Sequence, residues 1–288
     1  MNFLGLEGNA AAYESARAAL LPVPYDRTCS YVKGAAGGPE AILAASPNAE
    51  WYDEELDLDL ETIGIATLPP LDVDSLEPQE MVDLVEKHSS TLFADNKLVA
   101  GLGGEHTVSA GFVKAALARH PGLTVLQIDA HPDLRDSYEG RPICHATVGR
   151  RMVELAPLVQ VGVRAWSREE QDFMTSPSAH PHRLVTIPAA TVHRDADWID
   201  RVVAALGETT YITFDIDALD PALIPATGTP EPGGLSWRQA TDLLARVAIC
   251  TTIVGFDVVE LSPIKCLHHC DYTAARLVAR LIGLALSH

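Results

Sequence analysis

The stretch TVLQIDAHPDLRD, residues 124–136, joins an apolar run to a cluster of charged side chains. Its first six residues have the nearly continuous apolar character of a strand that is buried on both faces of a parallel sheet. Side chains two apart in an extended chain point to the same face, so Asp129, His131 and Asp133 are expected to converge. Carboxylates packed this closely repel one another and are costly to bury. We therefore expect a positive charge among them.

Similar apolar runs recur along the chain, with segments of helical periodicity between them. The predicted strands are residues 18–23, 62–67, 98–103, 124–129, 159–164, 183–188, 210–215 and 252–260. Predicted helices include residues 38–46, 81–94, 109–120, 195–207, 236–248 and 271–286. This alternation predicts an α/β fold in which helices cover both faces of one parallel sheet. Without a linker or an internal repeat, residues 1–288 are expected to form a single domain.

Ionisable residues follow four of the predicted strands. GGEH follows 98–103, DAHPD begins at the end of 124–129, DID begins at the end of 210–215, and Glu260 ends 252–260. In open parallel sheets the ligand site lies beyond the carboxyl ends of the strands. These four segments are therefore expected to meet at one rim. Residues 221–234, rich in proline and glycine, are expected to form an ordered loop beside it.

The candidate metal ligands carry a formal charge of −4 when the histidines are neutral, and two divalent cations would cancel it. Oxygen-rich donors without sulfur favour Mn²⁺, although affinity order also allows Zn²⁺, Co²⁺ or Ni²⁺. A single DxD or DxH triplet is often a solvated turn or a helix cap. Two triplets at strand ends, together with GGEH, favour a metal centre. The predicted ligands are His106, Asp129, His131, Asp133, Asp215 and Asp217.

Overall composition limits the kinds of molecule that the protein is expected to bind and the compartment in which it is expected to work. The formal net charge of −18 argues against nucleic acid or anionic lipid and suits a cationic small molecule. No apolar run approaches the roughly 20 residues of a membrane-spanning helix, and the N-terminus lacks a signal-peptide pattern. Five scattered cysteines indicate a reduced, cytoplasmic protein. GLGGEH matches neither the dinucleotide fingerprint nor the phosphate-binding loop, so nucleotide binding is not expected.

These motifs resemble those of the ureohydrolase family, which contains arginases and agmatinases. The resemblance rests on LPVPYDRTCSYVKGAAGGPEAI, GLGGEHTVS, DAHPDLRD, TFDIDALDPALIPATGTPEPGGLS and VVELSP, in this order. It implies a three-layer α/β/α fold with a central parallel sheet of about eight strands. It also implies two Mn²⁺ ions per subunit and a homo-oligomer, usually a trimer or hexamer. By position, Asp129 and Asp215 would bridge both ions, His106 and Asp133 would complete one site, and His131 and Asp217 the other.

The resemblance further implies hydrolysis of a guanidino group to urea and an amine. YEGRPICHATVGRRM and the Glu-Pro of TPEPGGLS are similar to agmatinases, so agmatine is the expected substrate, giving putrescine and urea. N1-aminopropylagmatine, 4-guanidinobutyrate, arginine and guanidine remain alternatives within the family. Outside it, a metal-dependent amide deacetylase and an inactive regulator of the same fold are the competing interpretations. The full second set of metal ligands argues against the first, and intact His145 and Glu260 against the second.

Three residues are assigned catalytic or substrate-binding roles. Asp133 is expected to hold the attacking water and pass on its proton, and His145 to bind substrate and protonate the departing amine. The Glu260 carboxylate matches a planar guanidinium through paired hydrogen bonds. Asp136 and Glu139 have two interpretations. They could attract the far amine of a diamine-like substrate, or they could simply belong to a solvated acidic loop.

Some residues depart from the family pattern. Thr107 and Ala226 stand where serine and glycine are usual, and Cys29 and Cys144 lie in segments expected to line the pocket. CLHHC, residues 266–270, matches no family motif. It is interpreted as a loop or helix start in preference to a further metal site.

Overall fold

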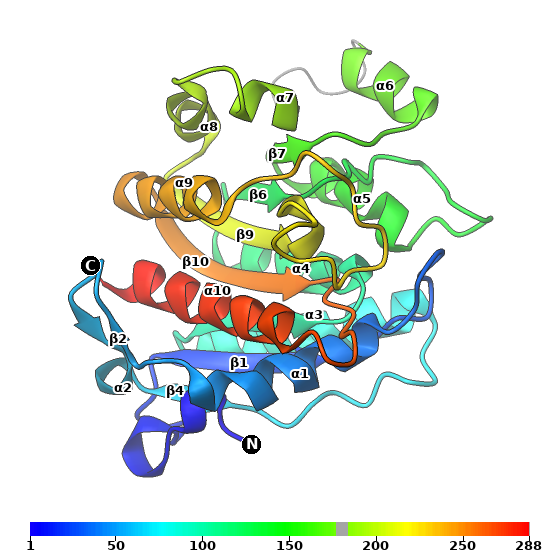
Figure 1. Cartoon of the computed structure of the whole chain (residues 1–288). Coiled ribbons are helices and arrows are strands. Elements are labelled where there is room, and N and C mark those ends of the chain that lie inside the picture. The colour runs from blue at the N-terminus through cyan, green and yellow to red at the C-terminus, as the bar shows by residue number, and fades with distance from the viewer. Residues whose placement is uncertain (177–183, 288) are drawn as a thin grey trace.

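The computed structural model describes residues 1–176 and 184–287. Its centre is an eight-stranded parallel sheet of order β4-β1-β5-β10-β9-β6-β7-β8 (Figure 1). The strands are β1 (Ala18–Val23), β4 (Ile65–Thr67), β5 (Leu98–Gly103), β6 (Thr124–Ile128), β7 (Leu158–Val163), β8 (Leu184–Pro188), β9 (Thr209–Asp215) and β10 (Thr252–Val259). The predicted parallel sheet of about eight strands is confirmed.

Helices cover both faces of this sheet. They are α1 (Gly38–Ala45), α2 (Leu60–Ile63), α3 (Pro78–Ala94), α4 (Ser109–Arg119), α5 (Val148–Leu155), α6 (Arg168–Thr175), α7 (Ala189–Val192), α8 (Trp198–Ala205), α9 (Trp237–Cys250) and α10 (His268–Leu286). Figure 1 shows α1, α9 and α10 in front of the sheet and α3 and α4 behind it. The three-layer α/β/α prediction is confirmed.

Two apolar cores form on opposite faces because successive side chains of a strand alternate between faces. In β1, Leu20 packs in the core shared with α1, α8, α9 and α10, whereas Leu21 packs in the core shared with α3, α4 and α5. Every residue of β1, β5, β6 and β7 is buried, as expected for inner strands covered on both sides. Burial on both faces leaves the carboxyl ends of the strands as the place for polar chemistry.

The predicted strand at 62–67 begins later than expected. Leu60–Ile63 forms the short helix α2, which starts where the Asp59 side chain accepts a hydrogen bond from the Glu61 N–H. Gly64, at φ 73°, ends the helix, and β4 then covers Ile65–Thr67. The N-cap bond and the left-handed glycine override the apolar run that suggested a strand. Residue 183 of the strand predicted at 183–188 lies outside the described residues.

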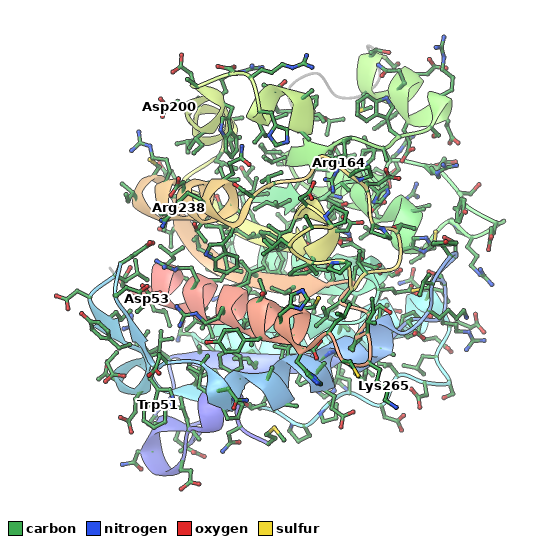
Figure 2. The ribbon with its side chains drawn as sticks, in the orientation of Figure 1. Trp51, Asp53, Arg164, Asp200, Arg238 and Lys265 are labelled. Carbon is green, nitrogen blue, oxygen red and sulfur yellow. The ribbon has the colours of Figure 1, made fainter. Side chains whose placement is uncertain are left out.

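A small antiparallel pair, β2 (Tyr52–Asp53) and β3 (Leu58–Asp59), was not predicted. It is tied to α10 by Arg280, whose Nε lies 3.1 Å from Asp53 Oδ2 and whose guanidinium also contacts Glu55 at 3.0 Å. Figure 2 shows Asp53 beside α10. Arg280 and Asp53 are both buried, so this ion pair joins the N-terminal third of the chain to its last helix.

Within the described residues, no helix has the length and apolar character needed to cross a lipid bilayer.

Candidate metal centre

The four central strands of the sheet bring the predicted metal ligands and Glu260 to one rim. β5, β10, β9 and β6 are consecutive neighbours, so their carboxyl ends lie side by side. His106 begins the 3₁₀ turn η5 (His106–Val108) just beyond β5, and Asp129 directly follows β6. Asp215 ends β9, and Asp217 lies in the 3₁₀ turn η7 (Ile216–Ala218) after it. Convergence at the rim therefore follows from strand order.

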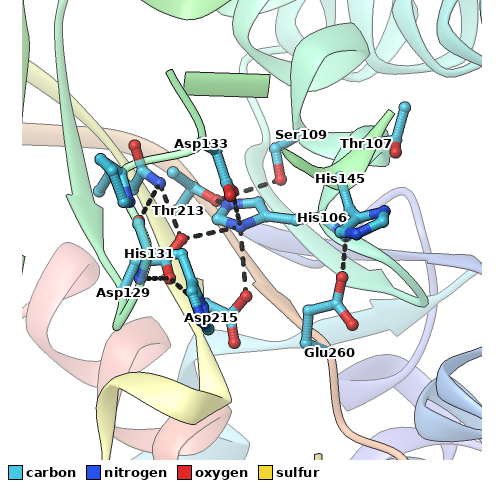
Figure 3. A network of polar contacts seen from close by, with 12 residues as sticks. His106, Thr107, Ser109, Asp129, His131, Asp133, His145, Thr213, Asp215 and Glu260 are labelled. Carbon is cyan, nitrogen blue, oxygen red and sulfur yellow. Dashed lines mark hydrogen bonds and ion pairs between the residues drawn. The ribbon is translucent and has the colours of Figure 1, made fainter. Parts of the chain in front are cut away.

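Three carboxylates surround one face of His106 (Figure 3). Its Nδ1 lies 3.0 Å from Asp129 Oδ2 and 3.3 Å from Asp133 Oδ2. Asp215 Oδ2 is also 3.3 Å from this nitrogen. Potential ligand atoms of His106, Asp129 and Asp215 all lie within 4.8 Å of one another, which is the spacing of donors around a single cation.

A second group adjoins the first and shares Asp129 with it. His131 Nδ1 lies 3.0 Å from Asp217 Oδ2 and 3.7 Å from Asp129 Oδ1. Ligand atoms of Asp129, His131 and Asp217 also fit within 4.8 Å. Asp129 is thus shared by the two groups, and its bridging role stays a prediction. Asp215 belongs only to the group with His106 and Asp129, and its bridging role also stays a prediction.

Donor chemistry in both groups fits divalent cations. His106 Nδ1 is buried, faces three carboxylates, and has no hydrogen-bond partner among the described residues. Burial, reinforced by the charge of Asp129, raises the pKa of Asp133 to about 7. Burial opposes charging of His131, yet Asp217 and its neighbours raise the pKa of that imidazole to about 11. Without cations the cluster holds protons to relieve its negative charge, and bound cations would take their place.

The ring of His106 is oriented from behind by polar side chains that were not predicted. Its Nε2 lies 2.9 Å from Thr213 Oγ1, and that hydroxyl donates to Asp257 Oδ1 at 2.7 Å. Ser109 and Tyr211 donate to the same buried carboxylate at 2.9 and 2.8 Å. This chain of donors leaves Nε2 protonated and directs the Nδ1 lone pair into the cluster.

One sequence signal could have revealed this network. Thr213 precedes Asp215 by two residues and therefore shares its side of β9, while Asp257 lies in the middle of the otherwise apolar strand β10. A buried carboxyl in such a strand requires partners, but its spacing does not identify them.

Two site residues have backbone conformations that are rare for residues with a side chain. Asp133 has φ 52° and Glu260 has φ 64°. Such left-handed residues are often found at functional sites, where the surrounding structure holds them in place. The Glu260 N–H donates to Gly104 O at 2.7 Å, and its Oε1 accepts from the His106 N–H at 2.7 Å. Glu260 is thereby held against the first metal group, and burial raises its pKa to about 8.

A cavity of about 350 Å³ opens above the cluster. His106, His131, Asp133, Asp215 and Asp217 line it together with the predicted catalytic residues His145 and Glu260. His145 lies in the 3₁₀ turn η6 (His145–Thr147), and its ring contacts the edge of Tyr138 at 5.7 Å between centroids. Burial lowers the pKa of His145 to about 4, and His106 and His131 add to this effect. Cys29, Tyr31 and Trp166 also line the cavity.

Other predicted candidates lie elsewhere. Asp136 and Glu139 are not among the residues that line the cavity, and they pair with Arg151 at 3.0 Å and Arg141 at 3.6 Å on the surface. In residues 1–176 and 184–287, the groups that could hold a metal do not include the 266–270 segment. There Cys266 is exposed, and Cys270 is buried in α10 with its Sγ 3.5 Å from His269 Nε2. These positions agree with a solvated acidic loop for Asp136 and Glu139 and with a helix start for residues 266–270.

Comparison with known proteins agrees with the motifs and the geometry. The model of the Arginase family matches residues 16–284. The N(1)-aminopropylagmatine ureohydrolase of Thermus thermophilus is 40% identical over 94% of this chain and 91% of its own. The agmatinase of Halalkalibacterium halodurans is 32% identical over 87% of this chain and 86% of its own.

Among solved structures, the agmatine ureohydrolase of Thermoplasma volcanium superposes with a TM-score of 0.86 at 30% identity. It covers 99% of this chain and 93% of its own. The chain belongs to the Arginase family and is a ureohydrolase of that family, as its motifs predicted.

Proposed function

We propose that this chain hydrolyses the terminal guanidino group of an agmatine-type substrate to urea and an amine. The observation that carries the proposal is the pair of adjoining ligand groups that share Asp129 at the floor of a cavity, with His145 and Glu260 among the residues that line it. For agmatine the products are putrescine and urea. N1-aminopropylagmatine is the second candidate, because several relatives at 36–40% identity bear its name, whereas those named agmatinase are about 32% identical.

His106, Asp129, His131, Asp133, Asp215 and Asp217 would hold two cations, for which Mn²⁺ is our proposal and Ni²⁺, Co²⁺ or Zn²⁺ the alternatives. When bound, such a pair lowers the pKa of water and so supplies a nucleophile near neutral pH. Without it the six side chains form an over-charged cluster that holds protons. The donor set, all imidazole and carboxylate, supports the assignment.

The chain's own residues then position the substrate and move protons. One carboxylate oxygen of Glu260 accepts from the His106 N–H, and the second has no such partner among the described residues. The carboxylate as a whole can still accept two N–H bonds from a planar guanidinium. Asp133 is placed to hold the attacking water and take its proton. Attack on the guanidinium carbon forms a C–O bond, and the C–N bond to the alkyl amine then breaks. His145 gives that nitrogen a proton, so that the products are urea and a neutral or protonated amine.

The remaining expectations also stand as proposals. We propose that residues 1–288 fold as one domain, supported by the single sheet that carries both cores. Family resemblance supports a homo-oligomer, a trimer or hexamer. The free cysteines support a reducing, cytoplasmic setting. A net charge of −18 favours a cationic substrate.

A substrate panel tests the proposal. The Mn²⁺-loaded enzyme is assayed for urea with agmatine, N1-aminopropylagmatine, 4-guanidinobutyrate, arginine and guanidine, and the amine product is identified. Preference for arginine, or no urea from any of them, contradicts the proposed substrate class. Asp217→Ala should lose one metal per subunit and most activity. Wild-type turnover with two metals bound would contradict the ligand assignment.

A further inference from the structure

Thr28, which the sequence did not single out, lies behind His145 in the segment that follows β1. It is 2% exposed. Its Oγ1 lies 3.3 Å from His145 Nδ1 and accepts from the His145 backbone N–H at 3.3 Å. The same hydroxyl is 2.6 Å from Glu105 Oε1. One side chain therefore connects a buried carboxylate to the imidazole.

Glu105 is fully buried and is surrounded by hydrogen-bond donors. Its Oε2 accepts from the Thr28 backbone N–H at 2.6 Å. Its Oε1 accepts from the hydroxyls of Thr28 and Thr107. Three donors converging on two oxygens are what an acceptor-only carboxylate requires.

The direction of the bonds follows from counting hydrogens. The Thr28 hydroxyl has one proton, and the short contact to Glu105 uses it. One of its lone pairs accepts from the His145 backbone N–H, and the other can accept from Nδ1 only if Nδ1 carries a hydrogen. Nε2 is then the nitrogen that exchanges protons, and it lies 3.4 Å from Ser30 Oγ, whose residue also lines the cavity.

We propose that Glu105 and Thr28 are positioning residues that hold His145 in its Nδ1–H tautomer, so that Nε2 faces the departing amine. This inference rests on the proposed function, in which His145 transfers the proton. Nε2 receives the proton that Asp133 took from the attacking water and releases it to the amine nitrogen, while the Nδ1–H bond to Thr28 persists. During the interval when the ring is positive, the Glu105 carboxylate stabilises it through the intervening hydroxyl.

Substitution of Thr28 tests this positioning role in the Mn²⁺-loaded full-length enzyme, with whichever guanidino substrate the wild type hydrolyses. Thr28→Val keeps the shape and removes the hydroxyl. We expect kcat to fall at least about tenfold, and by no more than the roughly 10²–10⁴-fold that a positioned acid–base group contributes in full, with KM changed less than about twofold. Thr28→Ser should restore most of kcat. Thr227→Val is the matched control, because the Thr227 hydroxyl is buried without a partner in the described part of the chain.

Glu105→Gln should reverse the polarity of the chain of bonds. The new NH₂ group would donate to the Thr28 and Thr107 hydroxyls, which turns the Thr28 proton toward His145 Nδ1 and moves the ring hydrogen to Nε2. We expect kcat to fall as in Thr28→Val, and the double variant to be no slower than the slower single variant. Metal content of the Thr28 variants should equal that of wild type, since Thr28 is not a proposed ligand.

The tautomer itself can be observed separately from turnover. In Zn²⁺-loaded protein labelled with ¹⁵N-histidine, the His145 resonances, assigned by their loss in His145→Asn, should show a protonated Nδ1. Thr28→Val with wild-type kcat, or a wild-type His145 protonated at Nε2, overturns the inference. If the wild type released urea from no guanidino compound, the proposed function would fail, and the NMR measurement would still decide the tautomer.

Discussion

Thr213→Val should weaken metal binding although Thr213 is not a proposed ligand. The valine side chain has nearly the same shape but leaves His106 Nε2–H without its acceptor and removes one donor from Asp257. Both groups are buried, with His106 1% exposed and Asp257 0% exposed. An unsatisfied buried polar group costs about 1–3 kcal/mol. Asp257 keeps the donors Ser109 and Tyr211, so most of the loss falls on the orientation of His106.

For metal affinity, loss of such an outer partner costs about 10–100-fold. This corresponds to about 1.4–2.8 kcal/mol, at 1.4 kcal/mol for each tenfold change. Global stability should fall by about 1–3 kcal/mol, which in a chain of this size lowers Tm by about 2–6 °C. The assays are calorimetric titration of the metal-depleted protein with Mn²⁺ and thermal melts at equal protein concentration.

Thr210→Val is the matched control on the same strand. The Thr210 hydroxyl is equally buried but has no hydrogen-bond partner among the described residues, so its removal should be neutral or stabilising. Equal Mn²⁺ affinities in wild type, Thr213→Val and Thr210→Val would refute the argument that Thr213 orients His106.

Three further predictions concern the substrate, the metals and the fold. Glu260→Gln should lower kcat/KM by about 10–150-fold, since a charge-assisted hydrogen bond contributes about 1.5–3 kcal/mol, and steady-state kinetics with unchanged metal content checks this. Removing the metals with a chelator should lower stability by about 2.7 kcal/mol for each of the two sites, relative to protein held at 100-fold the metal Kd. Melts that do not depend on added Mn²⁺ would count against a folded-state metal site. Arg280→Ala should destabilise the fold by about 3–5 kcal/mol, because it leaves the Asp53 carboxylate buried without its ion-pair partner. The control is Arg276→Ala, which breaks a pair at 4.0 Å with the mostly exposed Glu54 and should cost under about 1 kcal/mol. Denaturant titrations measure both changes.

The candidate metal ligands could be proposed from the sequence because their close spacing along the chain is a local property. Alternation along an extended chain predicts that Asp129, His131 and Asp133 lie together, and likewise Asp215 and Asp217. In the structure β6 ends at Ile128, Asp133 has φ 52° and Asp217 lies in the turn η7, so turns beyond the strands complete the grouping. Apolar runs identified the strands that carry them. Parallel strands that share a sheet must end at one rim, so even their meeting could be inferred without coordinates.

Partners across the sheet were not predictable in the same way. Gln127 donates to Asp129 Oδ2 at 2.7 Å and accepts from Gln160 at 2.9 Å, yet in sequence both glutamines are isolated polar residues inside apolar strands. Their pairing depends on the register of β6 with β7, which places Gln127 opposite Gln160. Register is decided by packing of whole strands against both cores, and no short motif records it.

By itself, then, the sequence determined the order of the central strands and the candidate ligand set, and it led to the expectation of cations to balance that set, because these follow from side-chain period and charge along contiguous residues. Only the tertiary structure decided which groups orient those ligands. Thr213 reaches His106 across 107 residues, and Glu260 reaches the same residue across 154. Such contacts exist because distant segments are buried at the same rim, where each donor and acceptor must find a partner once water is excluded.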